Sequence, residues 1–259
     1  MERHQLVSPD EWLAARRALL AKEKSLTEAR DALSAARRAL PWVKIEKDYV
    51  FEGPRGQESL GELFEGRGQL VVYHFMFGPD WPQGCPSCSF LADHIDGANQ
   101  HLKHHDVTLL AISRAPWPKI EAFRKRMDWH FKWVSSSAGD FNLDFHVSFT
   151  AADKAKGRVT YNFGTMDYMF DELPGASVFY RNEAGGIFHT YSAYARGLDL
   201  MLGAYNWLDL TPKGRNETRG MEWVRHHDRY DAAPGAASCC HDEALDPISA
   251  FRERHRQAG

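Results

Sequence analysis

The chain has 259 residues, of which 43% are hydrophobic, and its formal net charge is −3 at pH 7. This length is sufficient for one large domain or two small ones with a hydrophobic core. Positive and negative side chains are interspersed and no apolar run approaches the length of a membrane span, so we expect neither a nucleic-acid partner nor a membrane partner.

The first residues of the chain lack the apolar stretch of a secretory signal, which predicts a cytoplasmic protein. Thiols in the cytoplasm are kept reduced, and four cysteines in a chain of this length do not form a disulfide framework. We therefore interpret a closely spaced cysteine pair as catalytic or metal-binding.

A long helix is predicted first. Ser8 is a suitable N-cap, a proline follows it, and Glu11 completes a capping box. Trp12 is followed by a leucine at every seventh position, and Pro41 then ends the helix. This pattern predicts a helical arm over residues 1–41, about 45 Å long. A leucine column flanked by alanines can pack on its own domain or against a second copy, which would give a homodimer.

Apolar strands alternate with amphipathic helices through the middle of the chain. The predicted strands and helices, in order, are a short strand or hairpin at 42–51, strand 69–77, helix 85–105, strand 107–113, helix 119–127, strand 132–136, a hairpin of 177–181 with 187–191, and helix 198–208. This order predicts an α/β protein with a thioredoxin-like three-layer α/β/α fold and a mixed sheet over residues 42–210. Residues 137–175 are expected to be loop-rich. A polar, irregular and partly disordered C-terminal extension is expected over 211–259.

Two cysteines lie between the first of these strands and its following helix, in the order Cys85-Pro86-Ser87-Cys88. A strand, a loop and then C-x-x-C opening a helix is typical of a dithiol redox site. The partial positive charge of a helix N-terminus stabilises a thiolate, so we expect Cys85 to have a lowered pKa and to be the attacking sulfur. Cys88, one turn further on, would resolve the mixed disulfide. The alternatives are a structural thiol pair or half of a zinc site.

Several segments together resemble one bacterial family, the domain of unknown function 899. These segments are FMFGPDWPQGCPSCSF at 75–90, SRAP at 113–116, RM at 126–127, WVSS at 133–136, DFNLDFHVSF at 140–149 and LDLTPKGR at 208–215. The resemblance runs from about residue 8 to residue 230. It implies a thioredoxin-like fold and thiol chemistry, without an established reaction or substrate.

The chain departs from better-understood thioredoxin-like proteins at three places. Thioredoxins have a tryptophan directly before the first cysteine, whereas Trp81 lies four residues upstream. Thioredoxins place a cis-proline before the hairpin. Pro174 is the nearest candidate here, although Gly175 aligns with that position. Peroxiredoxins carry a threonine three residues before the reactive cysteine, where this chain has Pro82, so a conventional peroxidase site is disfavoured.

Other side chains are candidates for shaping the site. Asp80 is either a proton acceptor or a turn residue, and Trp81 could shield the thiols. Arg114 could favour a thiolate or form a structural ion pair. The aromatic region 141–170 is either a pocket wall or additional core. Residues 226–228, His-His-Asp, are expected on a solvated helix face.

The sequence thus predicts an enzyme, a thiol–disulfide oxidoreductase that needs no cofactor and acts on a protein or small-molecule disulfide or thiol. One alternative is a metal-binding or non-catalytic thioredoxin-like module, with zinc held by Cys85, Cys88, Cys239, Cys240 and His241. Another alternative is an atypical peroxide-reactive thiol protein.

Overall fold

The computed structural model describes residues 4–218 and 220–231. It divides the chain into two compact units, Met1–Trp42 and Val43–Gly259. The predicted Cys239, Cys240 and His241 lie outside the described residues.

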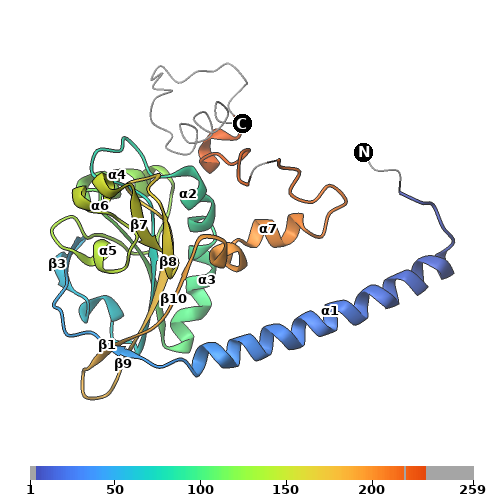
Figure 1. Cartoon of the computed structure of the whole chain (residues 1–259), viewed down its shortest axis with the longest axis horizontal. Coiled ribbons are helices and arrows are strands. Elements are labelled where there is room, and N and C mark those ends of the chain that lie inside the picture. The colour runs from blue at the N-terminus through green and yellow to red at the C-terminus, as the bar shows by residue number, and fades with distance from the viewer. Residues whose placement is uncertain (1–3, 219, 232–259) are drawn as a thin grey trace. The chain divides into compact units, whose positions relative to one another are not determined.

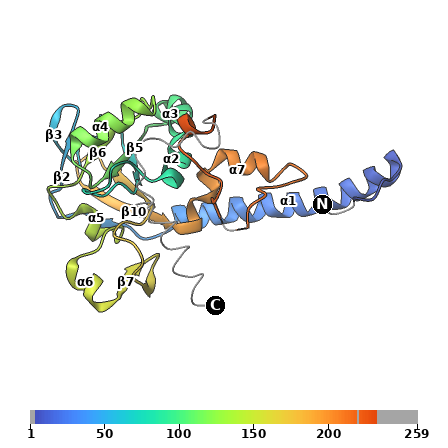
Figure 2. The same cartoon turned by 90° about the horizontal axis from the view of Figure 1, so that it is seen from above.

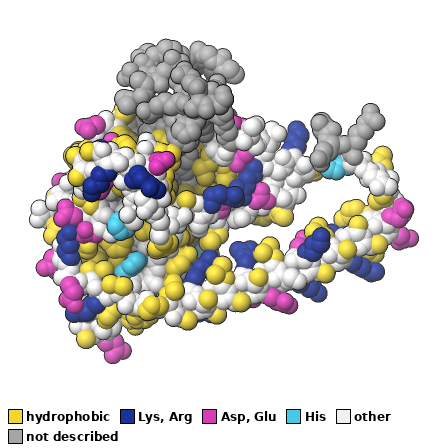
Figure 3. Space-filling model, in the orientation of Figure 1, with side chains coloured by type: hydrophobic (Ala, Val, Ile, Leu, Met, Phe, Trp, Pro, Cys, Tyr) yellow, Lys and Arg dark blue, Asp and Glu magenta, His cyan; other side chains and the backbone are white. Residues whose placement is uncertain are grey.

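The first unit is formed by helix α1 (Pro9–Arg38), as predicted (Figure 1). The N–H of Glu11 donates to Ser8 Oγ at 3.3 Å, and the Glu11 carboxylate accepts the backbone N–H of Ser8 at 2.9 Å, which closes the capping box. Apolar side chains are exposed along the helix, with Leu26 at 61% (Figure 3). The homodimer predicted from this leucine column stays a prediction.

The second unit is built on a mixed sheet of eight strands in the order β1-β10-β9-β4-β5-β6-β2-β3. The neighbours β4 and β5 are parallel, as are β5 and β6, whereas β9 runs antiparallel to β4 and β10 antiparallel to β9. The strands are β1 (Val43–Lys44), β2 (Val50–Gly53), β3 (Gly56–Ser59), β4 (Gln69–His74), β5 (Val107–Ser113), β6 (Trp133–Ser135), β9 (Gly175–Arg181) and β10 (Ile187–Tyr194).

Helices cover both faces of this sheet because successive strand residues point to opposite sides. Tyr73 and Ala111 belong to a core that also contains residues of α2 (Pro86–Ala92), α3 (Ile95–Leu102) and α4 (Trp117–Arg126). Val72 and Ile112 belong to the core on the other face, which is closed by a 3-10 turn (Glu62–Phe64) and by α5 (Phe141–Asp144). Figure 2 shows α4 and α5 on opposite sides of the strands. The three-layer α/β/α prediction is therefore confirmed.

The helix expected over 85–105 is interrupted between α2 and α3. At the break the Asp93 carboxylate accepts the indole N–H of Trp129 at 2.8 Å, and His94 Nε2 accepts the backbone N–H of Ala204 at 3.0 Å. The helix expected over 198–208 is also divided, into a 3-10 segment (Ala195–Met201) and α7 (Gly203–Leu208). Long-range hydrogen bonds thus fix breaks that local propensity does not indicate.

The region 137–175 contains more regular structure than we expected. Helix α6 (Ala151–Lys156) begins with a capping box between Thr150 and Asp153. Strands β7 (Arg158–Tyr161) and β8 (Gly164–Asp167) then form a separate two-stranded sheet. Four-residue strands give a weak periodic pattern, which explains why this hairpin was not predicted.

Candidate functional site

The two cysteines lie just beyond the carboxyl end of the central strand β4. Cys85 is the N-cap of α2 with an extended backbone, Pro86 occupies the first helical turn, and Cys88 follows within that turn. The N–H of Cys85 donates to the carbonyl of Met76 at 3.1 Å, and the N–H of Met76 points to Cys88 Sγ at 3.4 Å. The chain after β4 therefore folds back on itself and holds the two thiols side by side.

Both thiols are buried, with Cys85 4% and Cys88 2% exposed. Burial is the largest cause that raises the pKa of the Cys88 thiol well above its usual value of 9.0, and the neighbouring Cys85 raises it further. A hydrogen bond from the Tyr73 hydroxyl acts in the opposite direction. Burial also raises the pKa of Tyr73 well above 10.0, so this phenol keeps its proton and donates to the sulfur.

Three cationic or imidazole side chains hold the loop that leads to Cys85. Lys119 Nζ donates to the carbonyl of Pro79 at 2.7 Å, and Arg126 Nη1 donates to Gln83 Oε1 at 3.1 Å. His226 Nε2 lies 2.9 Å from the carbonyl oxygen of Gly84. The loop before the dithiol is thus held by two later parts of the chain, α4 and the C-terminal segment.

Gly84, directly before Cys85, has no room for a side chain. A Cβ at this position would lie 2.7 Å from ring atoms of both Phe75 and Phe123. These two aromatic rings belong to the core on the dithiol face. A glycine is therefore needed where the loop passes over that core.

The other predicted site residues lie at different places. Asp80 and Pro82 are exposed, whereas Trp81 is half-buried and packs against Gly78. None of them lines the cavity at the dithiol. Arg114 forms an ion pair with the buried Glu172 at 3.2 Å, which is the structural alternative stated for it.

Pro174 does line the cavity beside the cysteines. Its preceding peptide bond is trans. Gly175 is the first residue of β9, and a Cβ there would lie 2.7 Å from the Tyr194 ring. Pro174 and Gly175 thus lie where β9 begins, and the site-shaping role that we expected for them stays a prediction.

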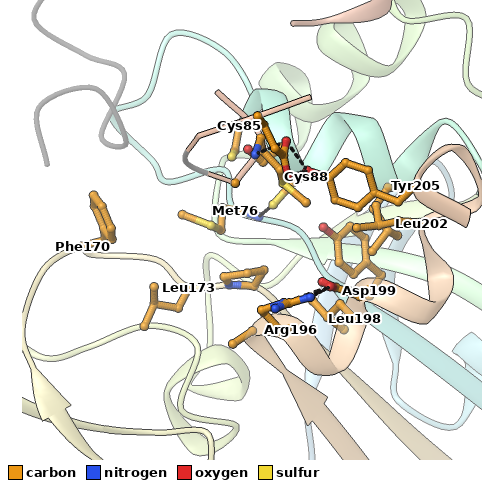
Figure 4. Close-up of a pocket in the computed structure, with 18 of the residues that line it drawn as sticks. Met76, Cys85, Cys88, Phe170, Leu173, Arg196, Leu198, Asp199, Leu202 and Tyr205 are labelled. Atoms are coloured by element: carbon orange, nitrogen blue, oxygen red, sulfur yellow. Dashed lines mark hydrogen bonds and ion pairs between the residues drawn. The ribbon is translucent and has the colours of Figure 1, made fainter. Parts of the chain in front are cut away.

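A cavity of about 560 Å³ opens onto the two thiols (Figure 4). Figure 4 shows Cys85, Cys88 and Met76 at one end and the Arg196–Asp199 ion pair at the other, with Phe170 and Leu173 facing Tyr205 and Leu202 across the space. Phe170 comes from the aromatic region that we considered as a pocket wall. Arg215, Glu217 and Met221 add a wall from the C-terminal segment.

The C-terminal segment corrects one expectation. His226 is not on a solvated helix face, because it is only 2% exposed and packs edge-to-face on Phe123 with ring centroids 5.3 Å apart. Arg126 pairs with Asp228 at 2.8 Å, and His227 lies 2.6 Å from Asp93. These partners are more than a hundred residues apart in the sequence, so no local pattern could have shown them.

His226 is held as a neutral imidazole. With its proton on Nε2 it donates to the Gly84 carbonyl, and Nδ1 accepts from Arg126 Nη2 at 3.3 Å. Burial is the main cause that lowers its pKa from 6.5 to about 4, and the Arg126 charge adds to this. The folded pKa lies below the unfolded pKa, so the stabilisation is present above about pH 6.5 and is lost as the pH falls toward about 4.

We therefore expect wild-type protein to lose about 2 kcal/mol more unfolding free energy than His226→Gln between about pH 6.5 and about pH 4.5. Urea unfolding at a series of pH values measures this difference. Glu172 contributes to the pH dependence of the unfolding free energy with the opposite sign, because burial raises its pKa to about 7. His74 contributes with the same sign as His226, because burial lowers its pKa to about 3. Both remain in the variant and cancel in the comparison. Parallel pH profiles for the two proteins would show that His226 is not held neutral.

In the part of the chain that the structure describes, no group of side chains completes a metal site with the two cysteines. Among residues 4–218 and 220–231, no three histidine, cysteine or acidic side chains are grouped so that they could hold a metal ion. A zinc site at Cys85 and Cys88 would thus need ligands from beyond these residues, and it stays a prediction. Within the same ranges, none of the helices is both long and apolar enough to cross a bilayer.

The fold is thioredoxin-like. Parallel β4 and β5 joined by helices, antiparallel β9 and β10, and a C-x-x-C pair after the central strand together define this class. The chain belongs to the family described as bacterial protein of unknown function (DUF899), which it matches over residues 1–230. The predicted family is thereby confirmed.

Comparisons with other proteins add the following. A search of curated proteins found no match. Among solved structures, the chain is similar to peroxidoxin BcpB from Mycobacterium tuberculosis, with 14% identity, a TM-score of 0.39 and coverage of 63% of this chain and 94% of that one. It is also similar to a putative thiol:disulfide interchange protein DsbE from Chlorobium tepidum, with 10% identity, a TM-score of 0.38 and coverage of 64% and 97%. Peroxiredoxin Q from Xanthomonas campestris gives 13% identity, a TM-score of 0.39 and coverage of 60% and 87%.

Proposed function

We propose that this protein is a thiol–disulfide oxidoreductase whose redox centre is the dithiol of Cys85 and Cys88. The observation that carries the proposal is the placement of both thiols in one helical turn at the end of the central strand, where both line the same cavity. A sulfur pair in one turn can close a disulfide, and the cavity gives a substrate access to it.

The reaction proceeds in two exchange steps. The Cys85 thiolate attacks one sulfur of a substrate disulfide, a bond to Cys85 forms, and the substrate S–S bond breaks with release of one thiolate. The Cys88 thiolate then attacks Cys85 Sγ, so that the mixed disulfide breaks and the second substrate thiolate leaves. Two electrons pass from the dithiol to the substrate, and the two dithiol protons end on the released thiols. A cellular thiol or dithiol reductant restores the dithiol by the reverse exchange.

The environment of the two thiols supports this division of roles. The raised pKa keeps Cys88 protonated while Cys85 attacks, so Cys88 does not compete for the substrate. When Cys88 must ionise for the second step, the Tyr73 hydroxyl and the Met76 N–H are in place to donate to its sulfur.

A single-turnover experiment tests the proposal. Full-length protein with Cys239→Ser and Cys240→Ser leaves only the site cysteines, and it is reduced and mixed with a slight excess of dithiodipyridine. We expect two pyridinethiones released per protein and a protein mass reduced by two hydrogens, because an internal disulfide forms. Two stable pyridyl adducts per protein, or no thione release, would overturn the proposal.

A further inference from the structure

The cavity also indicates which disulfide the dithiol reduces. We propose that the substrate is a compact, uncharged and largely apolar small-molecule disulfide that binds in this cavity, rather than a disulfide of a folded protein. This inference rests on the oxidoreductase function proposed above.

The burial of the thiols limits the size of the substrate. With Cys85 at 4% and Cys88 at 2% exposure, neither sulfur stands on an open surface where a folded protein could present its disulfide. The sulfurs border a cavity of about 560 Å³, and this volume is typical of a small-molecule site. The wall that Met221 adds from the C-terminal segment encloses the space further.

The chemistry of the walls limits the polarity of the substrate. Apolar side chains dominate the space between the thiols and the far end, and they are Met76, Leu91, Phe170, Leu173, Leu198, Leu202 and Met221. Burying an apolar ligand against them is favourable, whereas a charged ligand would lose its hydration there. The walls thus favour an apolar body around the reacting sulfurs.

The two arginines that line the cavity are already paired with carboxylates. Among the described residues, Arg196 and Arg215 both approach Asp199, at 2.8 and 3.5 Å, and Arg215 also pairs with Asp209 at 2.8 Å. Glu217 accepts the Tyr205 hydroxyl at 3.1 Å. Because both arginines are paired and Glu217 is hydrogen-bonded to neutral groups only, the described part of the cavity offers no free positive charge to an anionic disulfide, which disfavours that class.

Three disulfides distinguish the substrate classes. Reduced full-length protein with Cys239→Ser and Cys240→Ser is mixed with neutral dithiodipyridine, with the dianionic aromatic dithiobis(nitrobenzoate), and with insulin as a protein disulfide. Each rate is divided by the rate of N-acetylcysteine with the same disulfide, which removes differences in intrinsic reactivity. We expect the normalised rate for the neutral compound to exceed both others by about tenfold or more.

Two matched leucine variants locate the effect in the cavity. Leu173 lines the cavity, whereas Leu200 does not line it and is 53% exposed. Leu173→Trp fills the space and should lower the normalised rate for the neutral disulfide by about tenfold, whereas Leu200→Trp should change it by less than about twofold.

The outcomes separate this inference from the function on which it rests. Equal normalised rates for the three disulfides, or a preference for insulin, would overturn the substrate class while the oxidoreductase function stands. Equal rates for the two tryptophan variants would also overturn the assignment to this cavity. If Leu173→Trp does not fold, the comparison of the three disulfides with the unsubstituted site decides alone. No exchange with any of the three would overturn the oxidoreductase function itself.

Discussion

Replacing Cys88 by serine is expected to arrest the exchange reaction at a mixed disulfide on Cys85. The first step needs only the Cys85 thiolate, whereas the second needs a sulfur at position 88, and a serine hydroxyl does not attack a disulfide at neutral pH. In a background of Cys239→Ser and Cys240→Ser, the Cys88→Ser variant should therefore accumulate close to one adduct per protein. Mass spectrometry before and after addition of dithiothreitol measures the adduct.

Cys85→Ser is the matched control for this experiment. It leaves Cys88, whose pKa is raised mainly by burial, so we expect little or no adduct at the same pH and time. Serine is close to cysteine in size, so both variants should keep the packing around Met76 and Tyr73. If the adduct formed on Cys88 in Cys85→Ser as fast as on Cys85 in Cys88→Ser, the assignment of attacking and resolving sulfurs would be reversed.

The fold was predictable where the local pattern is strong. The capping box at Ser8 and the leucine at every seventh position define α1. The nearly continuous apolar runs define β4 and β5, which the structure places side by side at the centre of the sheet. The position of C-x-x-C between such a strand and a helix was sufficient to predict the thioredoxin-like class.

The breaks in the helices and the short elements were not predictable, because they depend on distant partners. Asp93 is held by Trp129, and His94 accepts the N–H of Ala204, the second residue of α7. Each side chain alone would suit a continuous helix. Strands β7 and β8 have four residues each, too few for an alternation that stands out from a loop.

Only the centre of the site was visible in the sequence. Cys85 and Cys88 are one motif, but the cavity next to them combines residues from widely separated segments, such as Tyr73, Leu173 and Arg215. The polar composition of the C-terminal segment suggested an extension apart from the domain. In the structure, His226 of that segment is buried against the loop before Cys85, so a few anchoring side chains outweigh the average composition.

The most direct test of the proposed function is the redox equilibrium of the two thiols. Full-length protein with Cys239→Ser and Cys240→Ser is equilibrated in glutathione and dithiothreitol buffers of graded potential, and the fraction of disulfide is read from the mass after alkylation. Burial disfavours the thiolate of Cys88, so the reduced form is not specially stabilised, unlike that of a strong oxidant. We predict one two-electron transition with a midpoint between roughly −270 and roughly −200 mV. If both thiols stayed reduced, and were therefore alkylated, at every potential, the proposed function would be contradicted.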